Sequence, residues 1–210
     1  SQLEHIEVND ACYLSPGFID IHVHGAAGSD IMDASQEALT KIKESLLESG
    51  VTSFLPTTMS MPVEDIKRSL AAVRMNMCKE VTGSRGARIL GVHLEGPFLN
   101  KKYKGAHTEE NIVLPDFNLI NEFIDIIKIV TLAPEIEGIG KLISFLRDKG
   151  IVCSAGHSAA SYEEMLAAID SGISHITHLF NAMPGLHHRN PGIIGTALTT
   201  DISVELIADF

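Results

Sequence analysis

Cysteine is scarce in this chain, and the few that occur are not spaced for cross-linking. Among the 210 residues there are three, Cys12, Cys78 and Cys153, and no two of them form a CxxC pair. An odd count without that spacing argues against a disulfide framework. Cys153 also lies in an apolar run that is typical of a buried strand. We therefore expect a protein of a reducing compartment and assign it to the cytoplasm.

Positive charge and long apolar runs are also in short supply. The chain has 16 Lys and Arg against 27 Asp and Glu, a formal net charge of -11, which disfavours binding to nucleic acid and to anionic membranes. No apolar run approaches the length that spans a bilayer, and the first residues lack the pattern of a signal peptide. With 45% hydrophobic residues the chain can still bury a substantial core. We expect a soluble protein whose partner is a small molecule.

Strand-like and helix-like segments alternate along the chain. Apolar β-branched runs indicate strands, and segments with a period of 3.6 indicate helices. The predicted strands cover 17–24, 51–58, 87–95, 127–133, 151–156, 175–181 and 203–210, and the predicted helices cover 35–49, 63–78, 139–149 and 161–171. Such alternation predicts a parallel sheet covered by helices, either a closed (β/α)8 barrel or an open doubly wound sheet.

Polar residues at the ends of the predicted strands favour the barrel. His22, His24, Glu95, His157 and His178 lie at or near the carboxyl ends of four different strands. A barrel gathers such residues at one rim, whereas an open sheet would spread them along a line. No GxGxxG follows the first strand to support a nucleotide-binding fold. We predict an α/β fold of the (β/α)8 TIM-barrel type.

The predicted barrel is incomplete. Seven strands are visible, whereas a complete barrel has eight strands and typically about 250 residues. The last apolar stretch runs to Phe210 without a helix or polar tail, so we expect a fragment whose first and last strands have unpaired edges. Residues 15–210 would form a partial barrel, the catalytic domain, and residues 1–14 the remnant of a small β element.

The first strand carries the most informative pair of residues. His22 and His24 are two apart and share one face of the strand, whereas Ile21 and Val23 point to the other face. This arrangement can present two neutral nitrogen ligands to one metal ion. For an isolated HxH, two buried histidines that are satisfied by hydrogen bonds are the alternative. Asp20, deeper in the same strand, is expected to orient an imidazole.

Four histidines and one glutamate on one rim would form a polar cluster whose desolvation only a metal or a substrate could offset. A divalent ion held by imidazole and carboxylate lowers the pKa of bound water and polarises a carbonyl, which is hydrolytic chemistry. Such chemistry also needs a general base or acid near the water. No residue of the chain is an evident candidate, so the base is expected on an eighth strand.

Five motifs together resemble a known family. They are HVHG at 22–25, HLEGPF at 93–98, KGAH at 104–107, AGHS at 155–158 and THLFNAM at 177–183. In sequence and in order they are similar to the motifs of the N-acetylglucosamine-6-phosphate deacetylases of the amidohydrolase superfamily. The resemblance runs from about residue 14 to Phe210. It implies removal of acetate from N-acetylglucosamine 6-phosphate to give glucosamine 6-phosphate, a step in amino-sugar catabolism.

The resemblance also implies a metal site. Glu95, His157 and His178 would form the main site, and His22 and His24 would add a second ion that Glu95 bridges to the first. Some members of the family lack the HxH pair and use a single ion, so one or two divalent ions are implied. Zinc is the first choice, and iron, manganese and cobalt also suit these ligands.

Further residues would contact the substrate. By the resemblance, His107 would touch the sugar or polarise the amide carbonyl, and Asn181 and Ala182 would face the phosphate end. Arg189 would bind phosphate with its planar guanidinium, near the interface of a homodimer, where it could serve the neighbouring subunit. The family's catalytic aspartate would lie beyond Phe210, so we expect the chain alone to have little or no turnover.

Two alternatives to this activity remain open. One is another amidohydrolase, either a deacetylase for N-acetylgalactosamine 6-phosphate or a relative that opens cyclic amides, although a phosphate-binding loop at 181–192 argues against a cyclic amide. The other is a non-catalytic module that binds a metal and a sugar phosphate without hydrolysis.

Overall fold

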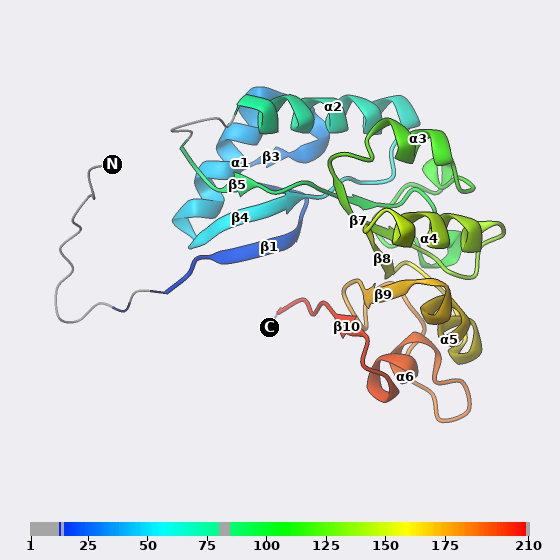
Figure 1. Ribbon diagram of the computed structural model, residues 1–210. Helices are drawn as coiled ribbons and strands as arrows, with labels where there is room; N and C mark the ends of the chain where they lie inside the picture. Colours follow the sequence, from blue (N-terminus) through cyan, green and yellow to red (C-terminus); the bar gives the residue numbers. More distant parts are fainter. Residues whose placement is uncertain (1–12, 14, 80–84, 209–210) are drawn as a thin grey trace.

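The computed structural model describes residue 13, residues 15–79 and residues 85–208 of the chain. Its strands run parallel in two sheets, in the order β1-β4-β5 and β6-β7-β8-β9-β10 (Figure 1). The strands are β1 (Phe18–Val23), β4 (Val51–Pro56), β5 (Arg88–Ile89), β6 (Val92–Glu95), β7 (Ile127–Leu132), β8 (Val152–Ala155), β9 (Ile173–Ile176) and β10 (Ser203–Val204). A parallel bridge between Thr57 and His93 joins the two sheets. Together they form the curved wall of a partial barrel.

Helices cover the outer face of this wall (Figure 1). They are α1 (Gln36–Glu48), α2 (Val63–Lys79), α3 (Phe117–Glu122), α4 (Ile139–Asp148), α5 (Tyr162–Ser171) and α6 (Gly192–Thr199). A small antiparallel hairpin, β2 (Gly25–Ala26) with β3 (Ser29–Asp30), follows β1, and short 3-10 turns occur at η1 (Ile31–Asp33), η2 (Lys101–Tyr103) and η3 (Glu109–Asn111). None of the helices in the described residues is long and apolar enough to cross a membrane.

Local sequence explains where the helices begin and what they bury. The Ser35 hydroxyl accepts the Ala38 amide at the start of α1, and Ser161 and Glu164 form a reciprocal capping box at the start of α5. On the inner face of α1, Leu39 and Ile42 are buried in a core that extends through all the long helices and the strands. Each such side chain stabilises the fold by roughly 1.5–3 kcal/mol.

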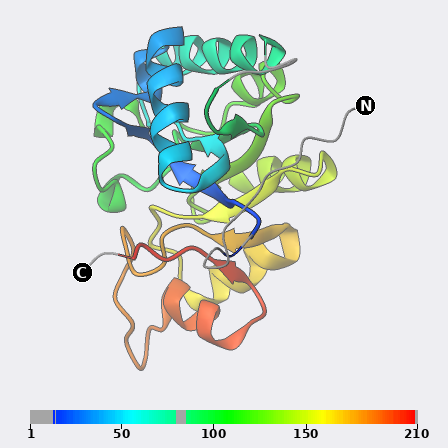
Figure 2. The ribbon, with the colours of Figure 1, turned by 90° about the vertical axis from the view of Figure 1, so that its left-hand side faces the viewer.

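The barrel is open between β1 and β10, the end strands of the two sheets (Figures 1 and 2). Along this opening, apolar side chains are exposed on both sides: Phe18 is 74% exposed, Ile19 61%, Leu206 64% and Ile207 53%. The α/β barrel-type fold predicted from the sequence is therefore confirmed, and so is its incompleteness.

Three predicted strands differ from the observed ones. The run 87–95 is divided into β5 and β6 at Gly91, where a Cβ atom would lie 2.4 Å from Lys128 Cγ. The run 175–181 is a strand only at its start, since β9 ends at Ile176. Of the run 203–210, only Ser203 and Val204 form the strand β10, and beyond it the backbone of Glu205 still bonds Ile176 and Leu179. α3, α6 and the β2–β3 hairpin were not predicted.

The prediction of a small β element at 1–14 falls outside the described residues except at Tyr13, and Cys12 lies outside them as well. The assignment of residues 15–210 to one catalytic domain also stays a prediction. Of the other two cysteines, Cys78 is exposed and Cys153 is buried, and both are free thiols.

Candidate metal and substrate site

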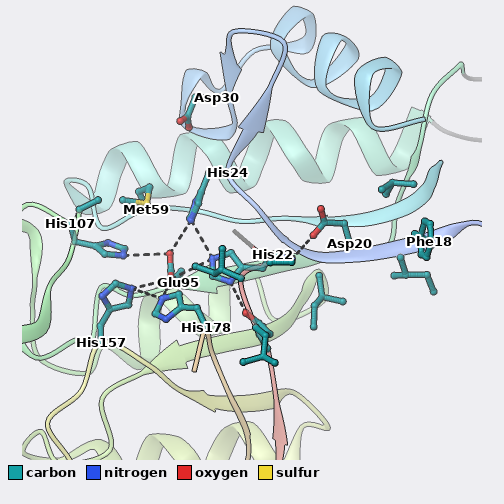
Figure 3. A pocket seen from close by; sticks show the side chains of 18 residues that line it. Phe18, Asp20, His22, His24, Asp30, Met59, Glu95, His107, His157 and His178 are labelled. Atoms are coloured by element: carbon teal, nitrogen blue, oxygen red, sulfur yellow. Dashed lines mark hydrogen bonds and ion pairs between the residues drawn. The ribbon is translucent and has the colours of Figure 1, made fainter. Parts of the chain in front are cut away.

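Five imidazoles surround the carboxylate of Glu95, the last residue of β6 (Figure 3). The Glu95 side chain is 2% exposed. Its Oε1 atom lies 3.0 Å from His157 Nε2, 3.2 Å from His178 Nε2 and 3.5 Å from His22 Nε2, and its Oε2 atom lies 3.2 Å from His24 Nε2 and 3.4 Å from His107 Nε2. The four histidines that the sequence analysis assigns to a metal thus meet around the carboxylate of the fifth such residue, Glu95. His107 joins them there.

The histidines reach this point from the carboxyl ends of three strands. His22 lies in β1 and His24 follows it, and their Nε2 atoms are 3.3 Å apart. His157 and His178 each lie two residues beyond the end of their strand, β8 and β9, and their Nε2 atoms are 3.0 Å apart. Both adopt left-handed backbone angles, with φ of 48° and 32°. Such angles are costly for residues with a Cβ and occur most often at functional sites.

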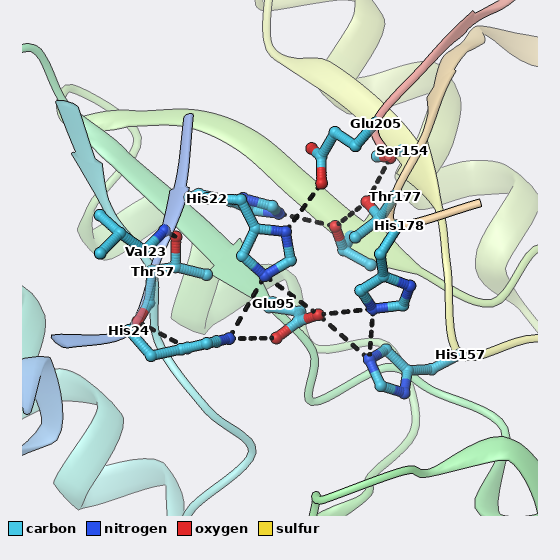
Figure 4. A network of polar contacts seen from close by, with 12 residues as sticks. His22, Val23, His24, Thr57, Glu95, Ser154, His157, Thr177, His178 and Glu205 are labelled. Carbon is cyan, nitrogen blue, oxygen red and sulfur yellow. Dashed lines mark hydrogen bonds and ion pairs between the residues drawn. The ribbon is translucent and has the colours of Figure 1, made fainter. Parts of the chain in front are cut away.

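The second ring nitrogen of three of these histidines identifies the tautomer (Figure 4). His157 Nδ1 lies 3.0 Å from the Tyr103 carbonyl, His24 Nδ1 lies 3.2 Å from the Thr57 carbonyl, and His22 Nδ1 lies 2.8 Å from Glu205 Oε2. Each of these oxygens can only accept a hydrogen bond, so each Nδ1 carries a proton and donates it. In the neutral ring Nε2 is then left with a lone pair that points at Glu95.

Lone pairs and carboxylate oxygens that converge without a donor repel one another unless a cation lies among them. Two overlapping groups around Glu95 have ligand atoms close enough together for a divalent metal ion: His22, His24 and Glu95 form one, and Glu95, His107 and His157 form the other. His178 adds a buried imidazole whose Nδ1 has no hydrogen-bond partner among the described residues. The residues therefore fit a metal ion.

Protons on the imidazoles can also balance the negative charge of Glu95. Burial lowers the pKa of His22, but hydrogen bonds to Glu205 and Glu95 outweigh burial and raise that pKa to about 10. Burial raises the pKa of Glu95, but hydrogen bonds from the surrounding imidazoles outweigh it and hold that pKa well below its usual value. The site thus attracts positive charge strongly.

His107 differs from the other histidines. Its Nδ1 accepts the Ser60 backbone amide at 3.0 Å, so its proton is on Nε2, the atom that faces Glu95. Burial is the largest influence on the His107 pKa and lowers it, so the ring stays neutral near pH 7. His107 therefore presents a neutral N–H donor to the site rather than a lone pair for a metal.

A cavity of about 1110 Å³ opens above this cluster. Met59 and Ala106 line it near His107, Asp30 lines it near His24, and its lining also includes residues 18–22 of β1 and residues 205–208. Asn181, Ala182 and Arg189 are not among its lining residues. Asn181 and Arg189 are exposed, and the Ala182 carbonyl accepts the Ser158 amide at 3.2 Å. None of the three lines the cavity, but the Asn181 backbone amide donates to the His178 carbonyl at 2.9 Å and the Ala182 carbonyl lies beside the loop of His157, so their role in substrate binding stays a prediction.

The expected role of Asp20 is wrong. Its Oδ1 atom accepts the backbone amide of His22 at 2.9 Å and does not contact an imidazole. Glu205, which the sequence analysis missed, holds the His22 ring instead. Its signal in the sequence is a lone carboxylate between Val204 and Leu206 in a predicted strand.

Glu135 is a second carboxylate that the sequence analysis missed. Oε1 accepts from Asn100 Nδ2 at 2.8 Å and from the Ala159 amide at 2.6 Å, and Oε2 accepts from the Ser158 hydroxyl at 2.6 Å. The backbone amide of Asn100 in turn donates to the His157 carbonyl at 2.9 Å. Glu135 thus ties the loop after β6 to the loop that carries His157.

Comparisons with known proteins agree with this site. The chain is 45% identical over 201 residues to an N-acetylglucosamine-6-phosphate deacetylase of Bacillus subtilis, covering 93% of this chain and 51% of the relative. It is 38% identical over 205 residues to an N-acetylgalactosamine-6-phosphate deacetylase of Escherichia coli O157:H7, covering 95% and 54%. The chain thus spans about half the length of the curated relatives it matches.

Solved structures of such enzymes share the fold. The N-acetylglucosamine-6-phosphate deacetylase of Thermotoga maritima superposes with a TM-score of 0.84 at 40% identity, over 92% of this chain and 52% of that one. The Mycobacterium smegmatis enzyme, a D267A mutant in complex with N-acetyl-D-glucosamine-6-phosphate, also has a TM-score of 0.84, at 31% identity, over 91% and 50%. The sequence pattern of the amidohydrolase family, whose members depend on metals, matches residues 13–204. The chain belongs to the amidohydrolase family.

Proposed function

We propose that the protein containing this chain hydrolyses the amide bond of N-acetylglucosamine 6-phosphate, releasing acetate and glucosamine 6-phosphate. The observation that carries the proposal is the convergence of imidazole lone pairs on the buried Glu95 carboxylate, which is a ligand set for a hydrolytic metal. The relatives that match nearly the whole chain are mostly named for this reaction.

The same residues would hold one or two divalent ions. Glu95, His157 and His178 would bind the first, and His22 and His24 would bind the second, with Glu95 between them. When bound, a divalent ion polarises a carbonyl oxygen and lowers the pKa of water. Zinc is our first choice for nitrogen and carboxylate ligands, ahead of iron, manganese and cobalt.

His107 would act on the substrate directly. Its Nε2–H is a neutral donor that faces the same space as the ligands, and the Ser60 amide fixes its orientation. A donor there is suited to the acetamide carbonyl, on which negative charge develops when water attacks. We assign the general base to an aspartate beyond Phe210, and infer that residues 1–210 alone have little turnover.

We assign the phosphate end of the substrate to the loop between β9 and α6. Arg189 is exposed there, and a guanidinium binds phosphate through two parallel hydrogen bonds. Asn181 and Ala182 would offer an amide and a backbone group. Because Arg189 does not line the cavity of its own chain, it would serve the neighbouring subunit of a homodimer.

The compartment and the partners follow from composition. Free cysteines favour the cytoplasm. The net charge of -11 disfavours nucleic acid and anionic membranes, so the proposed partners are the amino-sugar phosphate and a second copy of the protein.

Acetate release by the natural-length protein tests the activity. We expect kcat/KM for N-acetylglucosamine 6-phosphate to exceed that for the galactosamine epimer at least about tenfold, since one well-placed hydroxyl contact gives that discrimination. The His157→Ala variant should lose both metal and activity. The same assay on residues 1–210 alone tests the expected loss of turnover.

Each alternative has its own signature in this assay. A preference for the galactosamine epimer would support the second activity, for which a relative at 38% identity is named. Binding of the acetylated sugar phosphate without acetate release in the metal-loaded natural-length protein would identify a non-catalytic binding module.

A further inference from the structure

Glu205 contacts two histidines, one from each sheet, and Figure 4 shows its contact with His22. Its Oε2 atom accepts from His22 Nδ1 at 2.8 Å, and its Oε1 atom accepts from His175 Nε2 at 3.1 Å. The Glu205 side chain is only 12% exposed, and that of His22 is 16% exposed. Both carboxylate oxygens are therefore engaged in a largely dry environment, in which hydrogen bonds to a charged group are strong.

The backbone of Glu205 is anchored as firmly as its side chain. Its amide donates to the Ile176 carbonyl at 2.9 Å, and its carbonyl accepts the Leu179 amide at 2.9 Å. Leu179 directly follows His178 in the chain. Glu205 is thus attached by its backbone to the segment that carries His178 and by its side chain to β1. It joins the two strands that border the opening of the barrel.

The contact with His22 decides which nitrogen that ring presents. Because Nδ1 donates to Glu205, Nε2 is the atom left to face Glu95, 3.5 Å away, and His24, 3.3 Å away. Without this acceptor the His22 ring could rotate or take the other tautomer, and its lone pair would no longer point into the site. His24 is held in the same way by a backbone carbonyl, that of Thr57, which a side-chain substitution leaves in place.

A metal ion between Glu205 and the histidines would be a different explanation. His22, His93 and Glu205 lie close enough to be ligands of one ion. However, His93 Nδ1 donates to the Ile21 carbonyl at 3.0 Å, and His93 Nε2 bonds the Thr131 hydroxyl at 2.7 Å. Both nitrogens of His93 are thus occupied, so His93 has no free lone pair for a metal. Glu205 acts here as a hydrogen-bond acceptor.

We infer that Glu205 is a positioning residue for the His22–His24 half of the metal site, which it makes competent by fixing the orientation and tautomer of His22. The inference rests on the proposed metal-dependent function and adds to it a residue outside the ligand set. Partners of this kind affect metal affinity about 10- to 100-fold in other proteins.

The test is a metal titration of the natural-length protein. Metal-free protein is titrated with Co²⁺, and the visible spectrum and the bound cobalt per chain are measured in wild type, Glu205→Ala and His24→Ala. We expect Glu205→Ala to weaken the His22–His24 ion about 10- to 100-fold, with the same loss of absorption as His24→Ala, while the ion at His157 and His178 stays bound. Ser203→Ala is the matched control, since Ser203 contacts His175 from the same strand and does not contact His22.

A Glu205→Gln variant separates positioning from folding. Its side-chain carbonyl can still accept from His22 Nδ1, so we expect it to recover most of the affinity that Glu205→Ala loses. Cobalt affinity in Glu205→Ala equal to wild type, an equal loss in Ser203→Ala, or no recovery in Glu205→Gln would each overturn the inference. If His24→Ala weakens the ion and Glu205→Ala does not, the proposed metal site survives and only the role of Glu205 fails. Unchanged binding in both variants would overturn the site itself, and this inference with it.

Discussion

The nitrogen that each imidazole presents to the cavity depends on the partner of its other nitrogen. Carbonyl or carboxylate partners place the proton of His22, His24 and His157 on Nδ1, whereas a backbone amide places the proton of His107 on Nε2. The histidines around Glu95 are therefore suited to two different chemical roles. Three of them are suited to hold a cation, and His107 is suited to donate to an oxygen of the substrate.

This difference predicts that His107 can be lost without loss of metal. In the natural-length protein we expect His107→Asn to lower kcat about 10²- to 10³-fold, the cost of removing one donor from a developing oxyanion. Bound metal per chain, measured by elemental mass spectrometry, should stay unchanged. Ser60→Ala is the control, because it retains the backbone amide that holds His107 and removes a hydroxyl that has no partner. Loss of metal in His107→Asn would show that His107 is a ligand.

At the residue scale the sequence predicted the cluster of histidines around Glu95 better than the residues that hold it in place. His22, Glu95 and His178 stand out because polar residues at the ends of apolar strands are rare and come in motifs. Glu205 and Glu135 were missed because their partners lie far away in the chain, as with the 183 positions that separate Glu205 from His22. Such pairings depend on how the strands close, which no local pattern contains.

At the scale of elements, the loops after the strands carry the site, and this explains one of the strand errors. The run 175–181 is apolar enough to predict a strand, but His178 and Phe180 within it have positive φ. A strand cannot accommodate these angles, so β9 ends at Ile176 and the remainder forms a tight loop that turns His178 toward Glu95.

Below this loop, a chain of polar side chains links four strands. His93 Nε2 bonds the Thr131 hydroxyl at 2.7 Å, Thr131 bonds Thr177 at 2.7 Å, and Thr177 bonds Ser154 at 2.5 Å. Because His93 Nδ1 donates to the Ile21 carbonyl, Nε2 must accept, and each hydroxyl then donates toward His93. Protonation of His93 would add a second donor to this buried chain and force its hydroxyls to reverse.

This network predicts an acid-sensitive fold. Burial is the largest cause of the lowered His93 pKa, which falls from 6.5 to about 4. Between these values the unfolded chain binds a proton that the folded chain does not, so stability falls as the pH drops from 6.5 toward 4. We expect His93 to account for a loss of about 1 kcal/mol in the free energy of unfolding between pH 7.5 and pH 5.5. Urea unfolding of metal-free protein measures it, and His93→Gln should show a smaller loss. An equal loss in both proteins would contradict the prediction.

At the scale of the whole molecule, the open side of the barrel is the feature with the largest physical consequence. Phe18 and Ile19 on β1 face the opening together with Leu206 and Ile207 beyond β10, and each is more than half exposed. Strand edges with exposed apolar side chains pair readily with other chains. The repeating strand and helix pattern was enough to predict the parallel wall, because each unit is local. How the opening is covered depends on contacts between distant strands.

Residues 1–210 on their own are therefore expected to self-associate through this opening. Light scattering during size-exclusion chromatography over a range of concentrations should show a mass that rises with concentration. Phe18→Asp and Leu206→Asp should shift the molecule toward the monomer, because each places a charge where two apolar edges would meet. Leu198→Asp is the matched control: Leu198 is 65% exposed, like Leu206 at 64%, but it lies on α6 away from the opening. If all three substitutions change the mass equally, general surface charge explains the effect, and the two strand edges do not form the contact.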